Sequence, residues 1–139
     1  MADDFPLVGQ VIDYHYLWLW QDRRGETEGR KKRPSCMVVV AIDRDGKHHL
    51  FILPITSKKP AKDRQAILIP EIEARRGKLD TDKPLWVIVD ETNYDVLETS
   101  YTLEDRTARG QFSAAFSDQI VLAFKAVRAM QKLGITRRT

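Results

Sequence analysis

Two short basic segments carry the residue types with which a protein binds a phosphodiester. One is Arg30–Arg33, four consecutive cations followed by Pro34, and the other is Thr56–Lys59, two hydroxyls followed by two lysines. The planar guanidinium of arginine binds two phosphate oxygens at once, whereas lysine acts as a mobile point charge. Pro34 favours an extended conformation for Arg33. The two segments predict a phosphate site if the fold brings them together.

The sequence between these segments predicts a β-hairpin. Two nearly continuous apolar runs, Ser35–Ile42 and His49–Ile55, are separated by Asp43-Arg44-Asp45-Gly46. An Asp-Gly pair between β-forming runs is a strong hairpin signal. Because the outer ends of the two strands lie side by side, we expect Arg33 and Thr56 to meet at one edge of the sheet. Runs that are apolar on both faces are typical of a small closed barrel.

These pieces resemble the MazF/PemK family of toxin endoribonucleases. The resemblance is carried by Lys32-Arg33-Pro34 before a valine run and by Leu53-Pro54-Ile55-Thr56-Ser57, with support from Gly9-Gln10-Val11 and Leu85–Glu91. It implies an SH3-like barrel of five to six strands with a C-terminal helix, usually as a homodimer. It also implies metal-independent cleavage of single-stranded RNA and a cognate antitoxin that holds the toxin inactive.

Cleavage of RNA without a metal needs a base for the 2′-hydroxyl, a cation for the crowded phosphorane and an acid for the leaving oxygen. The resemblance assigns catalysis to Arg33, which would stabilise the transition state, and to Thr56, which would orient the phosphate. Asp90 is the candidate base, and its alternative role is to cap a turn at a strand end. The residues expected to hold flanking RNA are Lys31, Lys32, Ser57, Lys58 and Lys59.

The chain departs from the family pattern after Asp90. Many members continue with Gln and then Arg-Thr-apolar-Asp, whereas this chain has Glu91-Thr92-Asn93-Tyr94-Asp95, and Ile88 stands where the plasmid branch carries arginine. These differences leave no obvious second cation or acid. A second hypothesis is therefore a barrel that binds RNA, an antitoxin or another protein and cuts nothing. Its gyrase-poisoning form, which resembles CcdB, is disfavoured because the chain ends Thr136-Arg137-Arg138-Thr139 rather than Trp-Gly-Ile.

Other chemistries find little support in the sequence. His48 and His49 are neighbours on an expected strand and therefore point to opposite faces, and His15 lies among aromatic residues. No spacing of His, Cys and carboxylates predicts a metal site, no Gly-rich loop predicts a nucleotide site, and no cofactor is implied. Exposed aromatic side chains would stack on RNA bases. The tryptophans are nevertheless expected in the core: Trp18, Trp20 and Trp86.

Composition is typical of a single globular domain over residues 1–139. The chain is 42% hydrophobic and 31% charged, which excludes disorder. No apolar run approaches the roughly 20 residues of a membrane helix, and the acidic start is unlike a signal peptide. With Cys36 as the only cysteine, a cytoplasmic protein is the simplest interpretation. The net charge of +3 is modest, but basic residues concentrate at 30–33, 58–64 and the C-terminal tail.

The expected elements place the chain in the mainly β (α+β) class. A first strand is expected over residues 9–20, and a charged loop of about a dozen residues follows over 21–32. Later strands are expected at 66–70 and 85–90.

A C-terminal helix is the clearest single element. Apolar residues from Phe116 to Met130 recur at three- and four-residue spacing, Ser113 can cap the start and Gly134 can end it. We expect this stripe to pack on the barrel. The termini, 1–6 and 135–139, are expected to be frayed.

Overall fold

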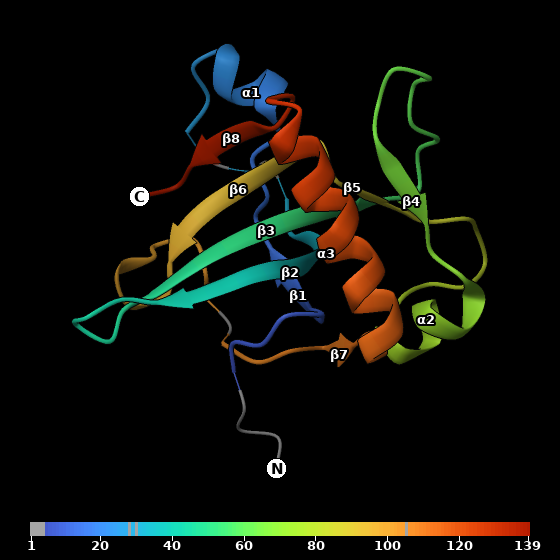
Figure 1. Cartoon of the computed structure of the whole chain (residues 1–139), viewed down its shortest axis with the longest axis horizontal. Helices are drawn as coiled ribbons and strands as arrows, with labels where there is room; N and C mark the ends of the chain where they lie inside the picture. The colour runs from blue at the N-terminus through green and yellow to red at the C-terminus, as the bar shows by residue number, and fades with distance from the viewer. Residues whose placement is uncertain (1–4, 28, 30, 105) are drawn as a thin grey trace.

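A curled eight-stranded sheet with one long helix against it forms the described part of the computed structural model (Figure 1). The structure describes residues 5–27, 29, 31–104 and 106–139. The strands in chain order are β1 (Gln10–Tyr14), β2 (Arg33–Ile42), β3 (His48–Thr56), β4 (Ala66–Leu68), β5 (Trp86–Ile88), β6 (Glu91–Val96), β7 (Gly110–Gln111) and β8 (Gly134–Arg137). The helices are α1 (Leu19–Arg23), α2 (Glu71–Arg76) and α3 (Ala114–Ala129), with a 3-10 turn at Leu97–Thr99. The mainly β class with a C-terminal helix is confirmed.

The expected hairpin forms the centre of the sheet. Strands β2 and β3 pair antiparallel, from Ser35 opposite Pro54 to Ile42 opposite His48. Gly46 in the connecting turn has φ +80°, a conformation that favours glycine. Strand β1 lies beside β2, and β5 and β6 lie beside β3. The hairpin therefore has a neighbour along both of its edges.

The sheet has an apolar cluster on each of its two faces, which explains why the central strands are apolar on both sides. In β1, Val11 enters one cluster and Ile12 the other, and in β2 Cys36 and Met37 alternate in the same way. The larger cluster also takes the inward face of α3: Phe116, Ile120, Phe124 and Val127. The expected packing of this helix on the sheet is confirmed. Ser113 caps it as expected, because its hydroxyl accepts a hydrogen bond from the Phe116 N–H at 3.2 Å.

The C-terminal expectations are wrong in two respects. Helix α3 ends at Ala129, and Gly134 is not its cap but the first residue of β8. Residues 134–137 are not frayed, because β8 pairs parallel with β6 and Thr136 is only 1% exposed. At the other terminus, residues 1–4 lie outside the described residues, and Pro6 is buried.

The N-terminal third also differs from expectation. The first strand stops at Tyr14, and residues 19–23 form the short helix α1 instead of more strand and loop. Five or six strands were expected, whereas eight are described, because β7 and β8 have only two and four residues and are too short to give a strand pattern. No helix in the described part of the chain is long and apolar enough to span a membrane.

Candidate functional site

The outer end of the β2–β3 hairpin opens into a cationic pocket of about 550 Å³, here called the hairpin pocket. The hairpin register carries Arg33 at the start of β2 and Thr56 at the end of β3 to this end, and both line the pocket. Ser57 and the two following lysines line it as well. Four cations and no carboxylate are found among its described lining residues: Arg33, Lys58, Lys59 and Arg64.

Arg33 is a half-buried cation. Its guanidinium carbon lies 5.1 Å from the centroid of the Trp18 ring, which is cation–π distance. Burial lowers the pKa of Arg33 from its ordinary value, against an opposing effect of Tyr16, and the side chain remains charged at neutral pH. Within the described residues Arg33 makes no ion pair. Because a partly desolvated cation without a counter-ion is unfavourable, the site favours binding of an anion.

Thr56 sits beside Arg33 with its hydroxyl fixed at the end of β3. The oxygen accepts a hydrogen bond from the Lys58 N–H at 3.1 Å, which turns the chain into the following basic loop. The hydroxyl hydrogen is thus available for donation to a ligand oxygen. Lys58 and Lys59 are exposed at the rim and carry positive charge to the surroundings of the pocket.

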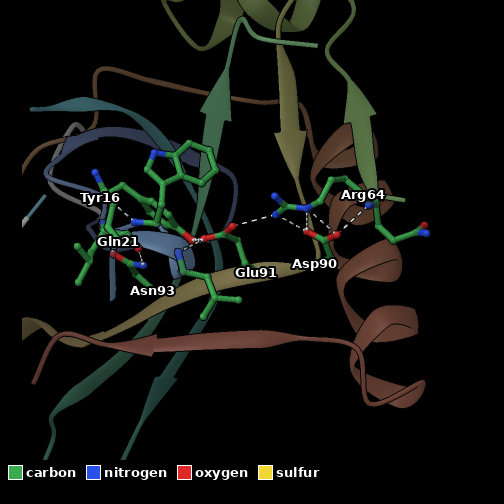
Figure 2. Close-up of polar contacts among 10 residues, drawn as sticks. Tyr16, Gln21, Arg64, Asp90, Glu91 and Asn93 are labelled. Atoms are coloured by element: carbon green, nitrogen blue, oxygen red, sulfur yellow. Dashed lines mark hydrogen bonds and ion pairs between the residues drawn. The ribbon is translucent and has the colours of Figure 1, made fainter. Parts of the chain in front are cut away.

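Arg64 is a pocket cation that sequence reasoning did not single out. Its Nε donates to both oxygens of Asp90, at 3.1 and 3.0 Å, and its Nη2 donates to Asp90 Oδ1 at 2.7 Å and to Glu91 Oε1 at 2.9 Å (Figure 2). These hydrogen bonds, those to Asp90 foremost, raise the pKa of Arg64 above its ordinary value. The signal that could have pointed to Arg64 is the pair of adjacent acids 90 and 91 at a strand end, because buried or half-buried carboxylates need a cationic partner.

Asp90 does not line the hairpin pocket. Its two oxygens accept from Arg64, and Oδ2 also accepts from the Gln65 N–H at 2.9 Å. The side chain is 13% exposed and lines a neighbouring pocket together with Arg64. Of the two roles predicted for Asp90, this geometry matches hydrogen bonding at a strand end. Asp90 acts on the hairpin pocket by fixing Arg64.

Glu91 connects Arg64 to helix α1. This carboxylate is 3% exposed and accepts hydrogen bonds from the Tyr16 hydroxyl at 3.1 Å and the Leu19 N–H at 2.9 Å, besides that from Arg64. Burial, followed by the charge of Glu91, raises the pKa of Tyr16 well above its ordinary value. Glu91 is one of the residues at which the sequence departs from the MazF/PemK pattern. Through these hydrogen bonds it forms part of a polar frame that positions the segment leading into α1.

Asn93 completes this frame on the same strand. Its side-chain oxygen accepts from the Leu17 N–H at 2.9 Å, and its amide donates to the Leu17 carbonyl at 2.7 Å. Gln21 is buried on α1, and its Oε1 accepts from the Trp18 N–H at 3.0 Å (Figure 2). Helix α1 is thus tied to the sheet although it has only five residues.

The two remaining predicted residues, Lys31 and Lys32, do not line the hairpin pocket. Lys32 forms an ion pair with Glu104 at 3.4 Å. Lys31 lines a smaller adjoining pocket together with Arg33 and Trp20. The core expectation for Trp20 is wrong, because this residue is 45% exposed, and Trp18 and Trp86 are only half-buried. Arg30 lies outside the described residues.

No metal site accompanies these cations in the part of the chain that the structure describes, since no three His, Cys, Asp or Glu side chains are grouped so as to hold an ion. Comparisons with family models, curated protein sequences and solved structures found no match for the chain.

Proposed function

We propose that this protein is a metal-independent endoribonuclease of the MazF/PemK toxin type that cleaves single-stranded RNA. The observation that carries the proposal is the convergence of Arg33, Arg64 and Thr56 on one pocket whose described lining residues include no carboxylate. A phosphodiester satisfies such a pocket, because its non-bridging oxygens accept from guanidinium and hydroxyl donors.

The proposed reaction is transfer of the phosphoryl group to the neighbouring 2′-oxygen. The 2′-oxygen attacks phosphorus, the bond from phosphorus to the 5′-oxygen breaks, and the products are a 2′,3′-cyclic phosphate and a 5′-hydroxyl. The 2′-hydroxyl proton passes to water, and water protonates the leaving 5′-oxygen. Arg33 and Arg64 stabilise the charge that develops on the phosphorane, and Thr56 donates a hydrogen bond to one of its oxygens.

Asp90 has a supporting role in this scheme. It holds Arg64 in a fixed position with hydrogen bonds to both of its oxygens, so that the second cation of the pocket is oriented before substrate arrives. Arg64 supplies the positive charge that the family pattern places elsewhere in the sequence. The SH3-like barrel, the homodimer and the cognate antitoxin belong to the same proposal, and the curled sheet with its C-terminal helix is compatible with them.

The test is cleavage of a long single-stranded RNA by the purified protein in EDTA. We expect discrete cuts with wild type and at least a hundredfold slower cleavage with Arg33→Ala and with Thr56→Ala, a loss in the range of single preorganised donors. Arg44→Ala is the matched control, because it removes an exposed cation from the hairpin turn at the opposite end of the same strands. Equal cleavage by all four proteins would refute the assignment of the site.

A second candidate function, an RNA-binding or antitoxin-binding barrel that cuts nothing, is favoured by one observation. Both oxygens of the predicted base, Asp90, are engaged by Arg64, so this carboxylate is not free to accept the 2′-proton. Folded wild-type protein that binds RNA and leaves varied sequences intact would support this function in place of the ribonuclease.

A further inference from the structure

A second cationic pocket adjoins the hairpin pocket, and we call it the helix pocket. It has a volume of about 660 Å³ and lies between α1, the end of α3 and the start of β8, which approach one another in Figure 1. Trp20 and Arg64 line both pockets. The two pockets therefore share a wall, and Trp20 stands between them.

The charge of the helix pocket is positive. Arg23, Arg24 and Lys132 line it in addition to Arg64, and all three are exposed and make no ion pair within the described residues. The carboxylates in its wall belong to residues 90 and 91, and both already accept hydrogen bonds from Arg64. Three cations are thus left for a ligand.

Trp20 is held outward by its own helix. Gln21, the next residue, is buried, and the Leu19 N–H before it donates to Glu91, so α1 has little freedom to rotate. The Leu19 side chain of α1 packs directly on β8, since a Cβ at Gly134 would lie 2.6 Å from Leu19 Cδ2. Arg24 lies over the Trp20 ring, 5.7 Å from its centroid. A large indole is consequently presented on a fixed support with a cation beside it.

We propose that the helix pocket is a second nucleotide subsite, in which one base of a single-stranded RNA stacks on Trp20 and its phosphate binds Arg23, Arg24 and Lys132. This inference rests on the proposed function, since the RNA strand would run from the hairpin pocket across Trp20. An exposed aromatic ring between two clusters of cations matches the alternation of base and phosphate along a single strand. Duplex RNA does not fit the site, because its bases are stacked within the helix.

The test uses fluorescein-labelled 2′-O-methyl RNA, which the protein binds without cleaving, in anisotropy titrations at several salt concentrations. We expect wild-type affinity to rise from a two-nucleotide to a six-nucleotide probe. Trp20→Ala weakens binding of the six-nucleotide probe by about 5- to 150-fold, the range for loss of one stacked base. Trp20→Phe retains most of the affinity, because phenylalanine also stacks.

The three cations are tested together in Arg23→Ala/Arg24→Ala/Lys132→Ala. Because each neutralised phosphate contributes about 0.7 to the salt dependence of single-strand binding, the slope of log affinity against log salt becomes shallower by about 2. The gain in affinity with probe length is also lost. Lys125→Ala, an exposed lysine of α3 that does not line the helix pocket, is the matched control and leaves the slope unchanged.

The possible outcomes separate this inference from the proposed function. Equal affinity of wild type, Trp20→Ala and the triple variant for the six-nucleotide probe overturns the subsite, even if Arg33→Ala abolishes cleavage. Weakened binding by those variants in a protein that cuts no RNA supports the subsite and refutes the ribonuclease. Absence of RNA binding by folded wild type refutes both. Far-ultraviolet circular dichroism of each variant establishes that it is folded.

Discussion

The role of Asp90 is decided by Asp90→Asn made in two backgrounds, wild type and Arg64→Ala. In the structure the carboxylate receives three guanidinium contacts of 2.7 to 3.1 Å and one N–H bond from Gln65. Asparagine keeps one acceptor oxygen but loses the negative charge and puts an N–H₂ group toward the arginine. We therefore expect Arg64 to lose its fixed position without loss of the fold.

The magnitude follows from the burial of the pair. A hydrogen bond to a charged group contributes about 1.5 to 3 kcal/mol, and loss of one partner of a fully buried pair costs about 3 to 5 kcal/mol. The Arg64 side chain is 33% exposed and retains contact with water, which reduces the effect. We expect Asp90→Asn to lower the free energy of unfolding by about 1 to 2 kcal/mol, measured by urea denaturation.

The expected effect on RNA cleavage is larger than the effect on stability. Misplacement of a catalytic group by about 1 Å lowers rates by about a hundredfold, so we expect Asp90→Asn to slow single-turnover cleavage in EDTA by roughly 10- to 100-fold. In the Arg64→Ala background the same substitution has little further effect, because the side chain that it positions is gone. If Asp90 were instead the general base, its loss would slow cleavage by roughly 10²- to 10⁴-fold in both backgrounds. An equal fold decrease in the two backgrounds would therefore refute the positioning role.

Three further predictions concern the stability of the fold. The Glu73 carboxylate of α2 accepts hydrogen bonds from the Ser113 N–H and hydroxyl at the start of α3, both at 2.8 Å, and pairs with Arg76. Glu73→Gln destabilises the protein by about 1 to 3 kcal/mol at pH 7. Burial alone would raise the pKa of Glu73, but hydrogen bonds from Ser113 and Arg76 lower the pKa overall, so its contribution is complete above about pH 4.5 and is lost as the pH falls through the folded-state pKa. Thermal melts across this range should show a smaller acid loss in the variant, and identical pH profiles would contradict the assignment. Asn93→Ala leaves the Leu17 N–H and carbonyl without partners and lowers the free energy of unfolding by about 2 to 4 kcal/mol, whereas a change below 1 kcal/mol in urea denaturation would contradict this. Deletion of residues 134–139 removes β8, which pairs with β6, and we expect it to lower the melting temperature. An unchanged melting temperature would instead favour the expectation that the C-terminal residues are frayed.

Local signals predicted the central hairpin and helix α3. The Asp-Gly turn and the two apolar runs specify β2 and β3 within a short stretch, and the apolar stripe with its Ser113 cap specifies the helix. The meeting of Arg33 and Thr56 at one pocket follows from the hairpin register alone, so it was accessible from sequence.

Features that depend on distant contacts were missed. Helix α1 has five residues, too few for a helical period, and it is held by Glu91, which is 72 residues away from Leu19 along the chain. Strand β8 has only four residues, too few for a strand pattern, and pairs with β6. Arg64 reaches Asp90 because β4 and β5 pair, a register that their short sequences do not specify. The outward position of Trp20 follows from α1 and was missed with it.

Two oligonucleotides of one sequence test the proposed ribonuclease activity in EDTA, an all-RNA strand and the same strand carrying a single 2′-deoxynucleotide at the mapped cut. We predict that wild type cuts the RNA to a 2′,3′-cyclic phosphate and a 5′-hydroxyl product, identified by mass spectrometry, and leaves the deoxy-substituted strand intact at that position. Cleavage of both strands, cleavage only after a divalent metal is added, or no cleavage of either by folded protein would contradict it.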